Sequence, residues 1–155
     1  MPAPDTYARP MADGENARTI TDQDRIRILE DGYAAWNRTG RFPIDAFHED
    51  VVWVPVREDP DFRVYEGLDE LQSYSETWTG NFDELQIETL EIVGEGNRLL
   101  AHIKLTGKGT GSGVPVEMEY GILYTLRGEM IIRAEEYSDL EQGRRVLHAP
   151  TEVER

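Results

Sequence analysis

The stretch from Leu85 to Tyr137 constrains the fold most, because it reads as four successive β-strands. It is rich in β-branched and aromatic residues, and glycine-bearing turns interrupt it at Gly94–Asn97, Gly107–Gly113 and Arg127–Gly128. Strands joined by such short turns pair antiparallel. The second half of the chain is therefore predicted to form an antiparallel sheet.

The first half of the chain is predicted to be mainly helical. Apolar residues at helical spacing indicate a helix from about Asp22 to Asn37. Thr21, with Asp24 three residues later, is typical of a helix N-cap, and Gly40 is the expected stop.

Further helices and one strand complete the predicted element order. They are expected as a short helix at 43–48, a strand at 51–56, a helix at 68–79 and a short C-terminal helix at 139–147. This order is an α+β pattern, in which helices pack on one face of a largely antiparallel sheet.

The length and composition suit a single domain. A chain of 155 residues is long enough for one core without covalent staples. We expect a flexible N-terminal arm at 1–21, the folded domain at 22–147 and a tail at 148–155, because the first residues are rich in proline and poor in apolar side chains. The absence of cysteine excludes disulfides and thiolate sites.

The charge of −15 argues against nucleic acid and anionic membrane surfaces as partners, since both require clustered Lys and Arg. No apolar run approaches the roughly 20 residues that cross a bilayer, so we expect a soluble, cytoplasmic protein. The histidines His48, His102 and His148 lack metal-ligand spacing, and no metal or other cofactor is expected.

Several short strings of residues carry a resemblance to a known family. They are Tyr33–Asn37, Phe47–Trp53, Leu105–Gly113, Tyr124–Gly128 and Arg133–Tyr137. In their order and spacing they resemble the SnoaL-like branch of the nuclear-transport-factor and ketosteroid-isomerase cone superfamily. The resemblance implies a conical α+β barrel with a deep apolar pocket, a small-molecule ligand and a homodimer formed through the outer face of the sheet.

The family fold does not determine the reaction, because it serves isomerases, cyclases, dehydratases and non-catalytic binders. Matching the isomerase template puts its general-base aspartate at Pro55 and its protonated aspartate near Ile122. Its oxyanion tyrosine falls near Gly32, one residue before Tyr33. These matched positions lack the required groups, so steroid isomerisation by that mechanism is not expected.

A turn at Arg127–Gly128 would pair Leu126 with Glu129 and place Tyr120 opposite Glu135. The family match then implies that alternate residues of the last strand face the pocket, as does His102 on another strand. The resulting pocket-lining set is Tyr33, Trp36, Trp53, Pro55, Tyr74, Trp78, Lys104, Met118, Ile122, Arg133 and Tyr137.

Two interpretations of the polar residues expected at the pocket stay open. In the first, His102, Glu135 and Tyr120 are catalytic: Glu135 orients or deprotonates His102, and Tyr120 donates a hydrogen bond. In the second, Glu135, Arg133 and Lys104 form a charge-balanced network near the pocket mouth and perform no chemistry.

The sequence thus supports two functional hypotheses. One is a cofactor-independent acid/base enzyme, of cyclase, isomerase or dehydratase type, that acts on an apolar cyclic metabolite. The alternative is a non-catalytic small-molecule-binding or dimerisation module of the same fold.

Overall fold

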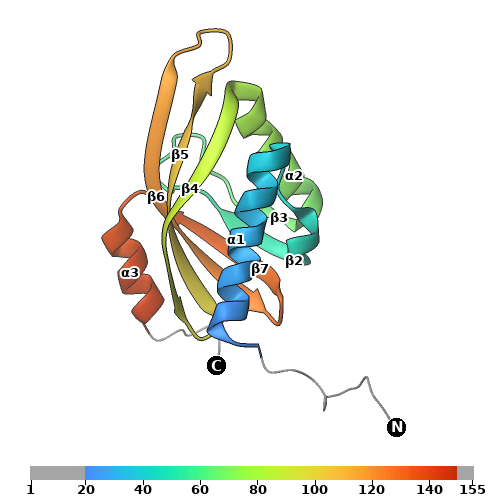
Figure 1. The fold of residues 1–155 in the computed structure, drawn as a ribbon, viewed down its shortest axis with the longest axis vertical. Helices are drawn as coiled ribbons and strands as arrows, with labels where there is room; N and C mark the ends of the chain where they lie inside the picture. The colour runs from blue at the N-terminus through green and yellow to red at the C-terminus, as the bar shows by residue number, and fades with distance from the viewer. Residues whose placement is uncertain (1–19, 150–155) are drawn as a thin grey trace.

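The computed structural model describes residues 20–149. Most of the predicted N-terminal arm and C-terminal tail lies outside these residues. Within them, the chain forms helices on both faces of one sheet (Figure 1). The elements are α1 (Asp22–Thr39), η1 (Ile44–Ala46), β2 (Phe47–Val54), β3 (Tyr65–Glu66), α2 (Gly67–Asn81), β4 (Phe82–Glu95), β5 (Arg98–Gly109), β6 (Pro115–Arg127), β7 (Met130–Tyr137) and α3 (Leu140–His148).

The sheet has six strands in the order β3-β2-β7-β6-β5-β4. Strands β2 and β7 pair parallel, and all other neighbours pair antiparallel. In the part of the chain that the structure describes, the sheet is curved but not closed. The predicted α+β class, with helices packed on a mostly antiparallel sheet, is confirmed.

Helix α1 begins and ends where its local sequence predicts. The Thr21 hydroxyl accepts a hydrogen bond from the Asp24 backbone N–H at 3.1 Å, and the Asp24 carboxylate accepts one from the Thr21 N–H at 3.0 Å. This capping box satisfies two N–H groups that have no partner within the helix. At the other end, Gly40 has a φ of 73°, a left-handed conformation that glycine adopts without strain.

The predicted helix at 43–48 is wrong. Only Ile44–Ala46 forms a single 3₁₀ turn, and Phe47 already belongs to β2. Phe47 and Val51 are buried within that strand, and burial of these side chains outweighs the weak local signal of Pro43 for a helix start.

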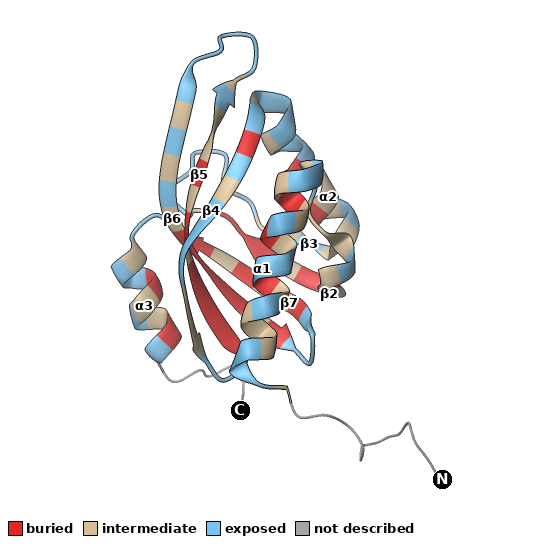
Figure 2. Cartoon of the chain, in the orientation of Figure 1, coloured by how far each residue is buried: buried red, intermediate tan, exposed pale blue. Residues whose placement is uncertain are grey.

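The helices divide between the two faces of the sheet. Helices α1 and α2 cover one face, which we call the inner face, and α3 covers the outer face (Figure 1). The buried residues concentrate where α1 and α2 meet the sheet, whereas the far ends of β4, β5 and β6 are more exposed (Figure 2). On the outer face, Leu147 of α3 packs with Leu100 and Leu123. A β-carbon added at Gly143 would lie 3.1 Å from a Leu100 methyl group, so α3 approaches the sheet closely at this glycine.

One side chain fastens α1 to the edge of the sheet. The Asn37 amide donates to the Ile87 carbonyl at 2.9 Å and accepts from the Ile87 N–H at 2.7 Å. It therefore satisfies both backbone groups of one residue on the edge strand β4, as a neighbouring strand would. This contact holds the C-terminal half of α1 over the inner face.

No helix formed by residues 20–149 is both long and apolar enough to cross a membrane.

The Asn37 contact leads to a stability prediction. Replacing Asn37 by Ala removes two hydrogen bonds and leaves the Ile87 backbone groups without their partner, so the free energy of unfolding should fall by about 1–3 kcal/mol. Urea denaturation followed by circular dichroism measures the loss. The matched control is Asn81→Ala, which removes one exposed hydrogen bond to the Thr77 carbonyl and should cost less than about 0.5 kcal/mol. Equal losses in the two variants would contradict this role for Asn37.

Candidate functional site

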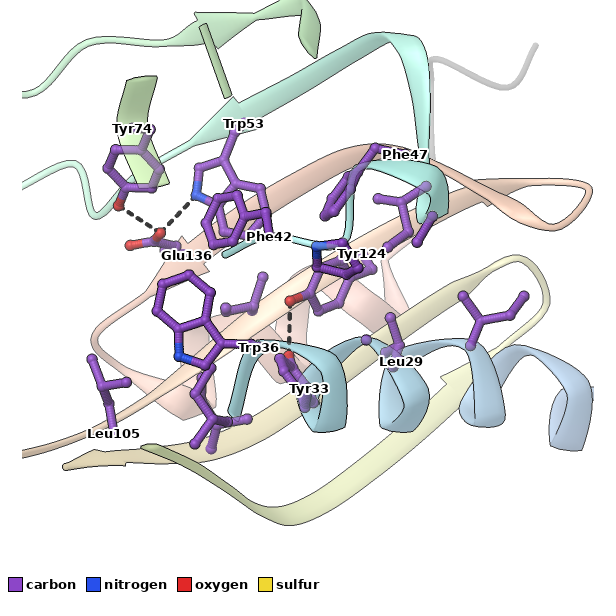
Figure 3. A pocket seen from close by; sticks show the side chains of 18 of the residues that line it. Leu29, Tyr33, Trp36, Phe42, Phe47, Trp53, Tyr74, Leu105, Tyr124 and Glu136 are labelled. Carbon is purple, nitrogen blue, oxygen red and sulfur yellow. Dashed lines mark hydrogen bonds between the residues drawn. The ribbon is translucent and has the colours of Figure 1, made fainter. Parts of the chain in front are cut away.

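A cavity lies between the inner face of the sheet and helices α1 and α2 (Figure 3). About 60 Å³ of it is open to the centres of water-sized molecules, which is enough for a few waters or for part of a small ligand. Its lining is mainly aliphatic and aromatic. Among the described residues that line it, Glu136 is the only Asp, Glu or His.

Glu136 is held in the cavity wall by two aromatic hydrogen-bond donors. Its Oε2 accepts a hydrogen bond from the Trp53 indole N–H at 2.6 Å and another from the Tyr74 hydroxyl at 2.8 Å (Figure 3). Trp53 comes from β2, Tyr74 from α2 and Glu136 from β7. Glu136 is only 6% exposed, so this carboxyl group is fixed in place and largely removed from water.

Burial shifts the acidity of Glu136. Removal from water penalises the ionised form and raises the pKa of its carboxyl group above the ordinary value of 4.5. The hydrogen bonds from Trp53, Tyr74 and the Val56 backbone oppose this rise without cancelling it. The result is a carboxyl group that holds its proton at a higher pH than an exposed glutamate does.

Two tyrosines form a second polar contact in the cavity. The hydroxyls of Tyr33 on α1 and Tyr124 on β6 lie 2.8 Å apart and share a hydrogen bond (Figure 3). Both side chains are buried, and burial raises the pKa of both hydroxyls, so both are neutral at physiological pH. They can donate or accept hydrogen bonds but supply no charge.

Much of the predicted pocket set does line this cavity. The residues found there are Tyr33, Trp36, Trp53, Tyr74, Trp78, Tyr120 and Ile122. Tyr120 is partly buried; desolvation of its hydroxyl, and after it the nearby Glu136, raise the pKa of that hydroxyl. Among residues 20–149, no group hydrogen-bonds to that hydroxyl, which leaves it available to a ligand.

The other predicted lining residues do not line the cavity, so their predicted placement is wrong. Pro55 is buried outside the cavity lining, and Met118 packs beside the cluster of Trp36, Leu85 and Leu105. Tyr137 packs with the residues under α3 on the outer face.

The predicted contact between His102 and Glu135 is not formed. The His102 ring lies 2.9 Å from the Glu119 carboxylate, and Glu135 pairs with Arg133 at 3.2 Å. On β5 the buried residues Ala101, Ile103 and Leu105 face inward, so His102 and Lys104 between them face outward. The apolar residues of this strand, and not its polar ones, meet the cavity.

A β-bulge explains why the side chains of β7 also face the opposite way from the prediction. Near the turn, Arg127 pairs with Met130 and Leu126 with Ile131, but Thr125 then pairs with Arg133. One extra residue in β7 shifts every later pair by one position. Beyond the bulge, Ile122 lies opposite Glu136, so Glu136 faces inward while Arg133, Glu135 and Tyr137 face outward.

Sequence reasoning missed Glu136, Tyr124 and Phe42 as cavity residues. Phe42 stacks on Trp53 with ring centroids 5.1 Å apart, and no periodic pattern marks it because it follows the end of α1. For Tyr124 a signal did exist, since it alternates with Ile122 and Tyr120 along β6. For Glu136 there was none, because the position depends on the bulge.

No group of three or more His, Asp or Glu side chains within residues 20–149 is arranged to hold a metal ion.

Solved structures with the same fold include proteins of several descriptions. A protein with a ketosteroid-isomerase-like fold from Catenulispora acidiphila, solved with trimethylamine, is 17% identical, with a TM-score of 0.64 over 79% of this chain and 93% of that one. A candidate polyketide cyclase from Xanthomonas campestris is 18% identical, with a TM-score of 0.65 over 78% and 94% of the two chains. A candidate SnoaL-like polyketide cyclase from Jannaschia is 18% identical, with a TM-score of 0.63 over 89% and 100%. At these identities the likeness shows the fold.

The comparison with curated proteins gave no match. The comparison with family models did: the SnoaL-like domain matches residues 29–134, which include most of α1, all of α2, most of the sheet and most of the cavity lining, and end just before Glu136. Since this match covers more than half of the chain and agrees with the fold, the chain belongs to the SnoaL-like domain family.

Proposed function

We propose that this protein binds a small, apolar, ring-containing metabolite in the cavity and acts on it as a cofactor-independent acid/base enzyme. Glu136 is the group that takes and returns the proton. The observation that carries the proposal is a buried carboxyl group with a raised pKa, held by two donors in the wall of an otherwise apolar cavity.

The proposed step is proton transfer at a carbon beside a carbonyl group. The Glu136 carboxylate removes the proton, and the electron pair of the broken C–H bond moves toward the carbonyl oxygen to give an enolate. The neutral Glu136 acid then returns a proton to carbon, and the carbonyl re-forms. A carboxyl group whose pKa is raised is, once ionised, a stronger base than an exposed one.

Glu136 takes the place that the sequence-based hypothesis gave to His102 and Glu135. Those two side chains lie on the outer face, where they cannot reach a ligand bound in the cavity. Tyr120 keeps its proposed part as a hydrogen-bond donor, because its hydroxyl belongs to the cavity lining.

The comparisons lend support of two kinds. The neighbours include candidate polyketide cyclases and a protein solved with the small organic molecule trimethylamine. Both are consistent with a small organic ligand here. The homodimer and the cytoplasmic location expected from the sequence remain parts of this proposal.

A non-catalytic binding module is the second candidate. It is favoured by the hydrogen bonds to Glu136 from Trp53, Tyr74 and Val56, which also suit a carboxyl group with a purely structural part. In that case the cavity holds a ligand, and Glu136 orders the wall around it.

Deuterium exchange separates the two candidates. In D₂O, the wild-type protein should accelerate exchange of the α-protons of cyclohexanone, followed by ¹H NMR, because Glu136 can remove them. Glu136→Gln should lower the protein-dependent rate by about 100-fold or more, since an amide of similar shape cannot accept the proton.

The matched control is Glu135→Gln, one residue away on the opposite face of β7. This variant should exchange cyclohexanone at the wild-type rate. Equal rates in the two variants would refute the assignment of Glu136, whereas cyclohexanone that binds without exchange would favour the non-catalytic module.

A second prediction concerns stability and pH. Because the pKa of Glu136 is raised in the folded protein, the folded state retains a proton that the unfolded state releases. The contribution of Glu136 to folding is therefore most favourable below pH 4.5, and it declines as the pH rises from 4.5 through the folded-state pKa. Glu136→Gln should remove this decline, as measured by urea denaturation at a series of pH values.

Here too Glu135→Gln serves as the reference, because its side chain forms a partly exposed pair with Arg133. Its stability profile should keep the decline seen in the wild type. A wild-type profile that matches Glu136→Gln across this pH range would be incompatible with a raised pKa.

A further inference from the structure

The cavity contains a carboxyl group without a counter-charge. Glu136 lines the cavity and accepts hydrogen bonds from Trp53 and Tyr74, which are both uncharged donors. No Lys, Arg or His is among the described residues that line the cavity. A buried carboxylate without a neighbouring cation is costly to ionise, and burial is the main reason that the pKa of Glu136 is raised. The cavity therefore lacks the positive charge that would stabilise this carboxylate.

Aromatic rings form much of the cavity wall around Glu136. Phe42 stacks on Trp53 with ring centroids 5.1 Å apart, and the Phe42 ring also lies 5.2 Å from Trp36. The ring of Tyr74 lies 6.0 Å from that of Trp53. All four rings line the same cavity as Glu136 and come from α1, the segment after it, β2 and α2 (Figure 3). The faces of aromatic rings carry partial negative charge, so they attract cations.

We propose that the cavity binds a quaternary ammonium group, with Glu136 as its counter-charge and the aromatic rings as its contact surface. A quaternary ammonium has no N–H, so it needs no hydrogen-bond acceptor. Its charge acts on a carboxylate across about 4–6 Å, and the cation therefore does not have to contact the carboxylate oxygens. This inference goes beyond the proposed proton transfer, because the cation would bind whether or not Glu136 acts on a carbonyl compound.

Other charged ligands fit this cavity less well. An ammonium group with N–H bonds needs several acceptors once it leaves water, whereas Oε2 of Glu136 already accepts two hydrogen bonds and most of the lining is apolar. An anion would bring a second negative charge beside Glu136. The open volume of about 60 Å³ corresponds to about four waters, which is comparable to the heavy atoms of tetramethylammonium. The cavity thus favours a compact, fully methylated cation.

The test uses two probes of the same shape: choline, and its carba analogue, in which a carbon atom replaces the charged nitrogen. Calorimetric titration of the wild type, above the titration midpoint of Glu136, should give about tenfold or higher affinity for choline. The methyl ¹H NMR signal of bound choline should move upfield, because protons over the faces of aromatic rings are shielded. Binding to carboxylates on the protein surface would not produce this shift.

Two single variants locate the counter-charge. We compare the ratio of choline to carba-analogue affinity in each protein, because a change in cavity shape affects both probes alike. In Glu136→Gln this ratio should fall about tenfold, since the amide carries no charge. Glu135→Gln, on the opposite face of β7, should keep the wild-type ratio.

The pH dependence gives an independent readout. A protonated Glu136 offers no counter-charge, so the wild-type ratio should rise as the pH rises through the Glu136 midpoint and then level off. The other titratable groups that interact with Glu136 are four tyrosines and one aspartate: Tyr33, Tyr74, Tyr120, Tyr124 and Asp59. The raised pKa values of the tyrosines keep them neutral over this range. Asp59→Asn should leave the rise in place.

The outcomes separate this inference from the proposed function. If both probes bind equally, or if Glu136→Gln keeps the preference for choline, the inference is overturned and the cavity remains a site for neutral ligands. Absence of choline binding also overturns it, while cyclohexanone exchange still decides the proposed function. Should Glu136→Gln fail to fold, the wild type decides: an upfield shift of choline that persists unchanged below the Glu136 midpoint would overturn the inference.

Discussion

The extra residue in β7 determines what this cavity can do. Between the pairs Leu126–Ile131 and Thr125–Arg133, the bulge shifts the register by one position, and side chains on a strand alternate between the two faces of the sheet. Without it, Glu135 would face the cavity and Glu136 would lie outside. With it, Ile131, Ala134 and Glu136 are the buried positions of the strand. The chemistry of the inner face therefore depends on this one irregularity in the sheet.

Glu136 owes its properties to opposing effects. Burial in an apolar wall disfavours the charged form, whereas the donors Trp53 and Tyr74 stabilise it, and burial is the larger effect. The balance leaves a carboxyl group that is fixed in position, can be ionised and has a raised pKa. Tyr120 adds a second kind of polar group to the cavity lining, a neutral hydroxyl.

Most of the fold could be predicted from local patterns, but the polar part of the site could not. The cap at Thr21, the stop at Gly40 and the four long strands depend on neighbouring residues, and sequence reports those directly. The aromatic lining was predicted in two ways: Trp78 from the helical spacing of its segment, and Trp53 from the family match. The family match predicted that His102 faces the cavity, and this was wrong. The alternation of Ala101, Ile103 and Leu105 already indicated that the apolar face of β5 is the buried one. Glu136 gave no signal, because a bulge depends on pairing between strands and leaves no mark in Ile131–Glu136 itself.

The most direct test of this account is an NMR titration of the side-chain carboxyl carbons of Glu136 and Glu135, assigned with the two single Gln variants. The account predicts that the Glu136 carbon titrates with a midpoint clearly above 4.5. A Glu136 midpoint at or below 4.5 would mean that its carboxyl group is solvated or fully stabilised as an anion, and would contradict the placement and chemistry described here.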